Sequence, residues 1–338
     1  ALKGTKFESV PVIGGRYGLG SKDTGPACYV AVFLNLMKEH PQHPFTIGIT
    51  DDVTHLSLPI EKHIDTQPPE NKSCKFWGLG SDGTVGANKN SIKIIGDHTD
   101  LNVQAYFQYD SKKSGGVTIS HLRFGPSKIR STYYVTESDF VACHNASYLE
   151  KYPMAQDCKP NGIFLINCGY DVKALSQILP AEEKRYIAAN NVQVYTIDAE
   201  KLGMELGLGN KYNSILQAAF FKLTNIIPID DAVKYMKDAI VASYGHKGDD
   251  VIKMNFAAVD AGLGNLVKIE VPESWLNAQP PKHTASKRKL TGNEALNDFL
   301  INVQIPANAM TGDTIPVSHL VSMADGTLPQ GSAAFEKR

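Results

Sequence analysis

The sequence predicts an α/β fold, with an open, mostly parallel sheet over residues 74–262 and shorter flanking segments. Apolar runs of strand length alternate there with helical segments, an order typical of parallel strands joined by helices. Several of these runs end in glycine-rich or polar turns, where an α/β sheet usually binds its ligands. The chain of 338 residues, 42% apolar and 20% charged, is long enough for two or three domains with their own cores.

The segments on either side of residues 74–262 do not predict complete domains. Residues 1–57 hold one predicted helix, 26–37, and one predicted strand, 45–49, so we interpret them as the end of a larger domain. Residues 58–73 are polar and rich in proline, and they are predicted to be a linker. Residues 263–338 are interrupted by prolines and are predicted to be an extended connector, with one helical stretch at 292–301.

Residues 75–95 combine a strand end, a glycine turn and the start of a helix. Phe76 and Trp77 lead into the turn, and helical spacing follows over residues 85–95. The glycines of the turn are Gly78, Gly80, Gly83 and Gly86. Backbone N–H groups and the positive end of the helix then face one point, which predicts an anion site. The first three glycines also satisfy the G-x-G-x-x-G pattern of dinucleotide-binding folds, although the acidic residue expected for a ribose is missing.

Three further stretches extend the predicted site. The strand-like run 103–109 is followed by Lys112 and Lys113 in a turn, and two ammonium groups suit a phosphate better than a ribose hydroxyl. The strand after this turn could also pair with the run before it as a local hairpin. Asn213 follows a glycine-rich turn at the predicted N-cap of a helix. Asn255 is predicted to lie at the end of an apolar strand, where a ligand could supply the partner that a buried amide needs.

Composition excludes several classes of function. A net charge of -1 favours neither nucleic acid nor an anionic membrane surface, and no apolar run approaches the roughly 20 residues of a membrane span. The cysteines form no C-x-x-C pair, which predicts reduced thiols in an intracellular compartment rather than a zinc or iron–sulfur site. The histidines form no pair at ligand spacing, so we predict no metal site and no catalytic residue in this chain.

Several blocks of the sequence resemble the pyruvate:ferredoxin (flavodoxin) oxidoreductase family, and the similarity extends over essentially the whole chain. The blocks are residues 15–22, 51–57, 78–89, 109–116 and 334–338. The resemblance implies that the chain is an internal fragment of a large homodimeric enzyme that converts pyruvate and CoA to acetyl-CoA and CO2. Such enzymes use thiamine diphosphate, magnesium and [4Fe-4S] clusters, and they pass electrons to ferredoxin or flavodoxin.

The resemblance also assigns roles to the parts of the chain. Residues 1–57 resemble the end of a transketolase-C-terminal-like domain, residues 74–262 a gamma-subunit-like domain, and residues 263–338 the connector before a ferredoxin-like domain. The thiamine and cluster sites are then expected outside this chain, so the isolated fragment is expected to be inactive. The implied location is the cytoplasm or a hydrogenosome-like organelle. The implied CoA-binding residues are Gly80, Ser81, Asp82, Gly83, Thr84, Lys112, Asn213 and Asn255.

Two other functions are alternatives to this interpretation. A nicotinamide-binding Rossmann-type domain is favoured by the glycine pattern alone. A non-catalytic interaction module could keep the same fold. Lys112 and Lys113 favour CoA phosphates over the ribose of a nicotinamide dinucleotide, and cluster-binding cysteines further along the reading frame would argue against the interaction module.

Overall fold

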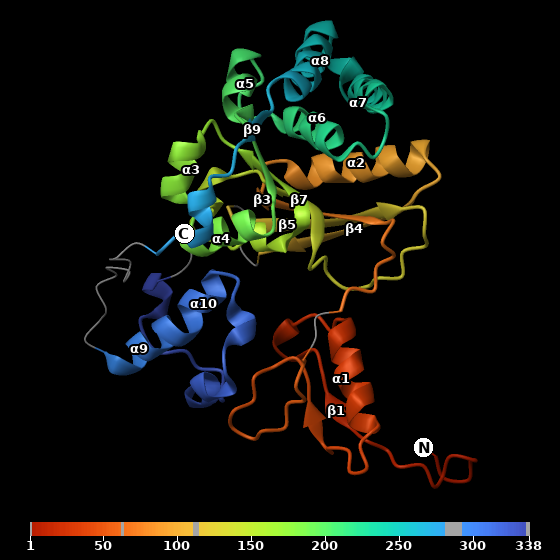
Figure 1. Ribbon diagram of the computed structural model, residues 1–338, viewed down its shortest axis with the longest axis vertical. Coiled ribbons are helices and arrows are strands. Elements are labelled where there is room, and N and C mark those ends of the chain that lie inside the picture. Colours follow the sequence, from red (N-terminus) through yellow and green to blue (C-terminus); the bar gives the residue numbers. More distant parts are fainter. Residues whose placement is uncertain (1, 62–63, 111–114, 281–292, 336–338) are drawn as a thin grey trace. The chain divides into compact units, whose positions relative to one another are not determined.

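The computed structural model of the protein describes residues 2–61, 64–110, 115–280 and 293–335 (Figure 1). The chain divides into two compact units. One unit comprises residues 67–284, and the other combines residues 1–66 with residues 285–338. This division does not test the domain ranges expected from the sequence, which stay a prediction.

Among the described residues, the unit 67–284 contains a seven-stranded sheet in the order β4-β5-β3-β6-β7-β8-β9 (Figure 1). Its strands are β3 (Lys72–Leu79), β4 (Asn102–Tyr109), β5 (Val117–Gly125), β6 (Ser138–Cys143), β7 (Cys158–Asn167), β8 (Gln193–Ile197) and β9 (Val267–Ile269). The inner strands β3, β6, β7 and β8 are parallel, whereas β4, β5 and β9 pair antiparallel with their neighbours. The predicted open α/β fold class is therefore confirmed, and β4 and β5 form the local hairpin that the sequence left as an alternative.

Helices cover both faces of this sheet (Figure 1). One face carries α2 (Thr84–His98), α5 (Ala199–Glu205), α6 (Asn213–Thr224), α7 (Ile229–Tyr244) and α8 (Asp249–Gly264). The other face carries α3 (Val172–Ile178), α4 (Ala181–Ala189) and a 3-10 turn around Trp275. Burial on both faces explains why the inner strands are almost continuously apolar in the sequence. In the described part of the chain, no helix is long and apolar enough to cross a membrane.

The second unit is built from two segments that are distant in the sequence. In the first segment, α1 (Pro26–Leu36) packs on a short parallel pair, β1 (Gly15–Arg16) and β2 (Phe45–Thr46). In the second segment, α9 (Glu294–Phe299) continues through a π-helical turn into α10 (Ile305–Asn308). A β-bridge joins Thr50 to Pro316, and the Ser318 N–H donates to Asp52 Oδ1 over 2.9 Å, so the segments form one unit.

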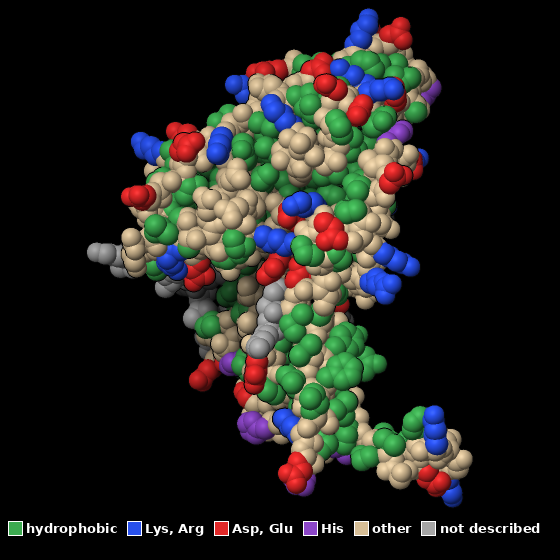
Figure 2. Space-filling view, turned by 45° about the vertical axis from the view of Figure 1, so that its right-hand side comes forward, with side chains coloured by type: hydrophobic (Ala, Val, Ile, Leu, Met, Phe, Trp, Pro, Cys, Tyr) green, Lys and Arg blue, Asp and Glu red, His purple; other side chains and the backbone are tan. Residues whose placement is uncertain are grey.

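Helix α1 leaves much of its apolar surface exposed. The side of the helix with Cys28 and Ala31 is buried against β2, while Tyr29 and Phe33 are 58% and 64% exposed and Met37, at the C-cap, is 81% exposed. Figure 2 shows hydrophobic side chains gathered on the surface of this unit. A contiguous apolar surface of this kind normally marks an interface.

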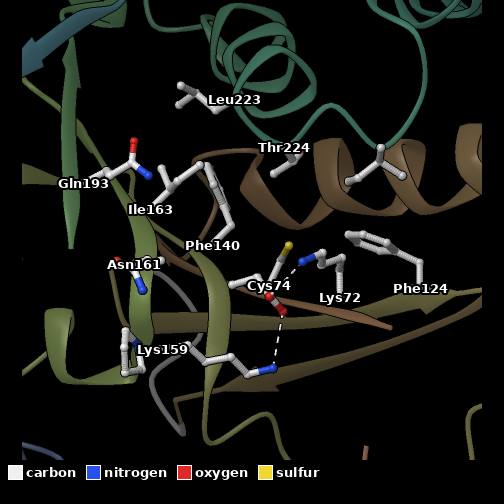
Figure 3. Close-up of a pocket in the computed structure, with 14 residues that line it drawn as sticks. Lys72, Cys74, Phe124, Phe140, Lys159, Asn161, Ile163, Gln193, Leu223 and Thr224 are labelled. Atoms are coloured by element: carbon white, nitrogen blue, oxygen red, sulfur yellow. Dashed lines mark hydrogen bonds and ion pairs between the residues drawn. The ribbon is translucent and has the colours of Figure 1, made fainter. Parts of the chain in front are cut away.

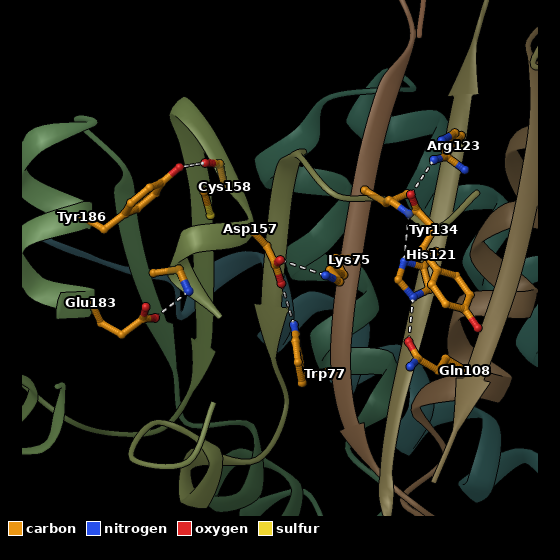
Figure 4. Close-up of polar contacts among 12 residues, drawn as sticks. Lys75, Trp77, Gln108, His121, Arg123, Tyr134, Asp157, Cys158, Glu183 and Tyr186 are labelled. Atoms are coloured by element: carbon orange, nitrogen blue, oxygen red, sulfur yellow. Dashed lines mark hydrogen bonds and ion pairs between the residues drawn. The ribbon is translucent and has the colours of Figure 1, made fainter. Parts of the chain in front are cut away.

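A buried polar network lies on the α3–α4 face of the sheet (Figure 4). The Lys75 ammonium pairs with Asp157 Oδ1 over 2.8 Å, and the Trp77 indole N–H donates to the other carboxylate oxygen over 3.3 Å. Glu183 of α4 accepts bonds from the Ala155 N–H and the Gln156 amide. Desolvation raises the pKa of Glu183 from 4.5 to about 7, because at 2% exposure its charged form is poorly hydrated.

The raised pKa of Glu183 predicts a pH-dependent contribution to stability. Between pH 4.5 and about 7, the folded state holds a proton on Glu183 that the unfolded chain releases, so stability falls as pH rises through this window. The full loss is roughly 3 kcal/mol, from 1.36 kcal/mol per unit of pKa. The Glu183→Gln variant has no titrating group at this position and so lacks this pH-dependent loss. We expect its free energy of unfolding to increase, relative to that of the natural chain, as pH rises from 5 to 8.

The measurement is urea unfolding of both proteins at pH 5 and pH 8. Burial lowers the pKa of His121 to about 3 and of His144 to about 4, and these two groups add stability with rising pH. Comparison of the variant with the natural chain cancels their contribution. Glu150→Gln, at an exposed glutamate whose charge does not act on Glu183, is the matched control. An equal stability difference at both pH values would show that Glu183 is not protonated in the folded state at pH 5.

Candidate functional site

The predicted glycine turn joins the end of β3 to the start of α2, at the carboxyl edge of the parallel strands. Its backbone has two left-handed residues, Ser81 with φ 76° and Gly83 with φ 89°. A Cβ on Gly83 would lie 2.5 Å from the Asn213 side-chain nitrogen, so both the conformation and the available space require glycine there. Ser81 and Gly83 are exposed, and a ligand can approach this turn from solvent.

The Asp82 carboxylate accepts three hydrogen bonds within the turn. It accepts bonds from the Leu79 N–H over 2.8 Å, the Thr84 N–H over 2.7 Å and the Thr84 hydroxyl over 2.8 Å. The glycine pattern predicts that the backbone N–H groups of the turn are free for a ligand, and for these two groups that prediction is wrong. The helix itself gives no partner to the N–H groups of Val85 and Gly86, since they lie in its first turn. Val85 and Gly86 are therefore the residues whose N–H groups the helix leaves to another partner.

His144 contacts the Thr84 hydroxyl and supports this arrangement. It was not identified from the sequence as part of the site. It follows β6, is buried, and its Nδ1 lies 2.8 Å from the Thr84 hydroxyl oxygen. Because the single hydroxyl proton of Thr84 is donated to Asp82, His144 Nδ1 must carry a proton and donate it to Thr84. Burial lowers the pKa of His144 to about 4, so the imidazole is neutral at physiological pH.

The hairpin turn between β4 and β5 lies against the glycine turn. The Gly80 N–H donates to the Gly116 carbonyl over 2.7 Å, and the Gly115 N–H donates to the Gly80 carbonyl over 3.4 Å. The described end of the second turn, Gly115 and Gly116, therefore lies beside the glycine turn. Lys112 and Lys113 belong to residues 111–114, which lie outside the described residues.

Asn213 lies at the glycine turn, in a role that differs from the predicted one. It is the first residue of α6, and the N-cap is Tyr212. Its side-chain nitrogen donates to the Asp82 carbonyl over 2.7 Å, so the amide connects α6 to the turn instead of capping its own helix. The predicted N-cap position of Asn213 is therefore wrong, and its role in ligand binding, which the family resemblance implied, stays a prediction.

Asn255 lies in a helix, not at the end of a strand as predicted. It is buried within α8, and its side-chain nitrogen donates to the Val251 carbonyl over 2.8 Å. Residues 249–264 form one helix because two acidic residues, Asp249 and Asp250, occupy its first turn and the apolar positions recur at helical spacing. The described hydrogen bond of Asn255 goes to Val251, and none connects it to the glycine turn.

The topology around the turn separates this site from a dinucleotide fold. In a Rossmann unit, the helix after the glycine turn leads into a strand parallel to the first one. Here α2 leads into β4, which runs in the same direction as β3 but does not pair with it, because β5 lies between them and is antiparallel to both. The helix N-terminus therefore lies beside a hairpin, and not beside the adjacent parallel strand that positions a ribose in a dinucleotide-binding βαβ unit.

Comparison with known proteins gives a consistent result. A family model described as pyruvate ferredoxin/flavodoxin oxidoreductase matches residues 73–264, and a model for a domain of unknown function matches residues 285–338. The chain is 52% identical over 331 residues to a pyruvate:ferredoxin oxidoreductase of Moorella thermoacetica, covering 98% of this chain and 28% of the relative. It is 50% identical over 328 residues to a pyruvate-flavodoxin oxidoreductase of Enterobacter agglomerans, covering 97% and 27%.

A solved pyruvate oxidoreductase subunit from Thermotoga maritima is similar with a TM-score of 0.49 and 16% identity, covering 60% of this chain and 99% of that chain. The two sequence relatives are each between three and four times as long as this chain, since it spans 28% and 27% of their lengths.

Proposed function

Because this chain belongs to the pyruvate ferredoxin/flavodoxin oxidoreductase family, we propose that its unit 67–284 supplies CoA binding in a 2-oxoacid oxidoreductase. The whole enzyme would convert pyruvate and CoA to acetyl-CoA and CO2. Ferredoxin or flavodoxin would take the electrons, as the names of the two relatives say of those proteins. Thiamine diphosphate, magnesium and [4Fe-4S] clusters would be held by other parts of a homodimeric polypeptide.

The contact between the two turns is the observation that supports CoA binding most strongly. The hydrogen bonds of Gly80 with Gly115 and Gly116 hold the hairpin turn beside the N-terminus of α2. Lys112 precedes Gly115 by three residues, so we expect its ammonium group to reach the same edge of the sheet. A helix N-terminus and a lysine would then approach a phosphate from two different elements, and each of them favours a bound anion.

The residues present fit the phosphates of CoA. A Cβ on Gly86 would meet no atom within 4 Å, so the helix start is open to a ligand at the position where N–H groups are available. The Asp82 carboxylate places a negative charge close to this point, and a phosphate bound there needs a compensating cation. We therefore assign Lys112 a larger energetic role than the turn N–H groups.

Each candidate residue then has a separate role. Gly83 allows the left-handed path of the turn, and the Gly80 backbone joins it to Gly115 and Gly116. Ser81 lies exposed on the turn, and Asp82 with Thr84 fixes its shape. Asn213 holds the turn through its nitrogen and presents an amide oxygen, an acceptor suited to the polar atoms of pantetheine or adenine. Asn255 donates one amide hydrogen to the Val251 carbonyl, so its second N–H and its amide oxygen are the groups that it could offer to CoA.

We also propose that residues 1–57 complete a transketolase-C-terminal-like domain, and that residues 263–338 connect to a ferredoxin-like domain. The exposed apolar side of α1 supports the first proposal. A parallel pair of two-residue strands, β1 and β2, is too small to be stable alone and needs further elements around it.

Calorimetric titration of the chain with CoA, NADH and NADPH tests the ligand class. We expect saturable binding of CoA and no comparable binding of either nicotinamide. Tight nicotinamide binding without CoA binding would contradict the proposal and favour the Rossmann alternative. Parallel titrations of the full-length polypeptide control for a site that other domains complete.

A further inference from the structure

One buried amide lies where three parallel strands end, at the same edge of the sheet as the glycine turn. Asn167 is the last residue of β7, and it is only 8% exposed. The strands β6 and β8 flank β7 and run parallel to it, so all three end at this edge. A buried amide needs partners for its N–H groups and its oxygen, and those partners show which elements the residue connects.

The Asn167 side chain connects the backbone beyond the ends of both neighbouring strands. The pairing of β6 with β7 ends at Cys143 and Ile166. The next carbonyl after β6, that of His144, accepts a bond from Asn167 Nδ2 over 3.0 Å. On the other side, Asn167 Oδ1 accepts from the N–H of Ala199, the first residue of α5, over 3.0 Å. That N–H has no acceptor within its own helix, so one side chain fixes both the start of α5 and the residue that follows β6.

The first of these contacts leads to the glycine turn through His144. The imidazole Nδ1 of His144 donates to the Thr84 hydroxyl, which in turn donates to the Asp82 carboxylate. The backbone N–H of His144 donates to the Trp77 carbonyl over 2.8 Å, so this backbone is held by β3 on one side and by Asn167 on the other. Because the imidazole moves with its backbone, Asn167 helps to determine where Nδ1 meets Thr84.

A second connection reaches the same turn from α6. Burial raises the pKa of the Tyr212 hydroxyl, and a side-chain hydrogen bond to Asn167 opposes this rise. Tyr212 is the N-cap of α6, and the next residue, Asn213, donates to the Asp82 carbonyl over 2.7 Å. The two connections therefore start at one amide and end at one residue of the turn, which is held through its carboxylate and through its carbonyl.

We infer that Asn167 is a positioning residue for the ligand of the glycine turn, although it lies two strands away from β3. It holds His144 and the start of α6, and these hold Asp82 in place. An anion at the start of α2 needs N–H groups that point in one direction, and that direction follows the backbone of the turn. The inference rests on the proposed function for the identity of the ligand, CoA, whereas the hydrogen bonds of Asn167 do not depend on it.

Two measurements on the variant Asn167→Asp test this role. The carboxylate keeps an acceptor for Ala199, but it has no hydrogen to donate to the His144 carbonyl. We expect the Kd for CoA to rise about fivefold, an effect typical of residues that act on a site through others. We also expect the Nδ1 proton of His144, followed by NMR of isotope-labelled histidine, to exchange faster with solvent, because its bond to Thr84 is less firmly held.

The matched control is Asn161→Asp, near the other end of the same strand. Asn161 is exposed and lines a cavity of about 340 Å³, so this variant places the same charge at the edge opposite to the glycine turn (Figure 3). Exchange of the Trp77 indole proton, which is bonded to Asp157, reports general loosening of the unit. Tyr212→Phe removes only the connection through α6. Its side chain is partly exposed, so this variant is expected to fold and to weaken CoA binding about twofold.

Unchanged exchange of the His144 proton in Asn167→Asp, or an increase no larger than that of the Trp77 proton, would overturn the inference. So would an unchanged affinity for CoA in both Asn167→Asp and Tyr212→Phe. If the natural chain binds no CoA, the titrations are made with the full-length enzyme. Absence of CoA binding there as well would count against the proposed function, while the exchange of the imidazole proton still decides the role of Asn167.

Discussion

Replacing Asp157 by alanine is expected to destabilise the unit 67–284 by about 3 kcal/mol. The Lys75 and Asp157 side chains are 11% and 18% exposed, and their charged atoms lie 2.8 Å apart. Removing the carboxylate leaves the Lys75 ammonium largely buried without its ion-pair partner. It also removes the acceptor of the Trp77 indole N–H. Burial raises the pKa of Asp157 despite the nearby ammonium, which shows that desolvation outweighs attraction for this pair.

A double-mutant cycle measures this effect. We expect Asp157→Leu and Lys75→Met each to be strongly destabilising, and the double variant to recover most of the loss, because an apolar pair leaves no buried charge. The free energy of unfolding is measured in urea by tryptophan fluorescence, since Trp77 and Trp275 both lie in this unit. Asp157→Asn keeps an oxygen that can accept the Trp77 hydrogen bond, so it measures the effect of losing the negative charge alone.

The exposed pair Lys201–Glu205 provides the surface control. Its side chains are 69% and 58% exposed with a separation of 4.0 Å, so Glu205→Ala should cost less than about 1 kcal/mol. A loss at Asp157→Ala no larger than this control, or a double variant less stable than either single variant, would contradict a buried ion pair at Lys75.

Replacing Asp82 by alanine is expected to have the second large effect, on both stability and ligand binding. Three donors, two of them backbone N–H groups of Leu79 and Thr84, lose their shared acceptor. We expect a loss of about 3 kcal/mol in the free energy of unfolding, because bonds to a charged acceptor are strong and their donors are only partly solvated when left unpaired. Without this brace, the backbone of the turn can relax away from its left-handed conformation at Ser81 and Gly83.

The same variant is expected to weaken CoA binding more than tenfold, since a displaced helix start no longer presents its N–H groups in one direction. Asp82→Asn keeps one acceptor oxygen and should fall between the natural chain and Asp82→Ala in both measurements. Unfolding in urea and calorimetric titration with CoA give the two values. Tighter CoA binding by Asp82→Ala would show that the carboxylate acts as a competitor of the phosphate and not as a brace.

The fold class could be predicted because alternating apolar runs and helical segments determine it locally. The sequence could not decide whether β4 and β5 form a hairpin, because the residues of a strand do not specify the direction of its partner. Asn255 was placed in a strand because Val251–Met254 is a short apolar run, for which strand and helix periodicity cannot be distinguished.

The candidate site was predictable in position but not in its hydrogen bonding. Glycine spacing located the turn, and the position of Lys112 suggested a second turn close to it. The function of Asp82 as a brace depends on His144, which reaches Thr84 across a separation of 60 residues. A histidine after a strand carries no signal of such a partner, because the contact is created by the pairing of β3 with β6.

The affinity of the Lys112→Ala variant for CoA tests the proposed CoA site most directly. In the full-length enzyme, we expect the Kd for CoA to rise about tenfold, as for one lost ammonium–phosphate contact, while the neighbouring Lys113→Ala has a smaller effect. A smaller loss for dephospho-CoA would place Lys112 at the 3′-phosphate, and an equal loss would place it at the diphosphate. Unchanged affinity for CoA in Lys112→Ala, or the same loss in both lysine variants, would contradict the site.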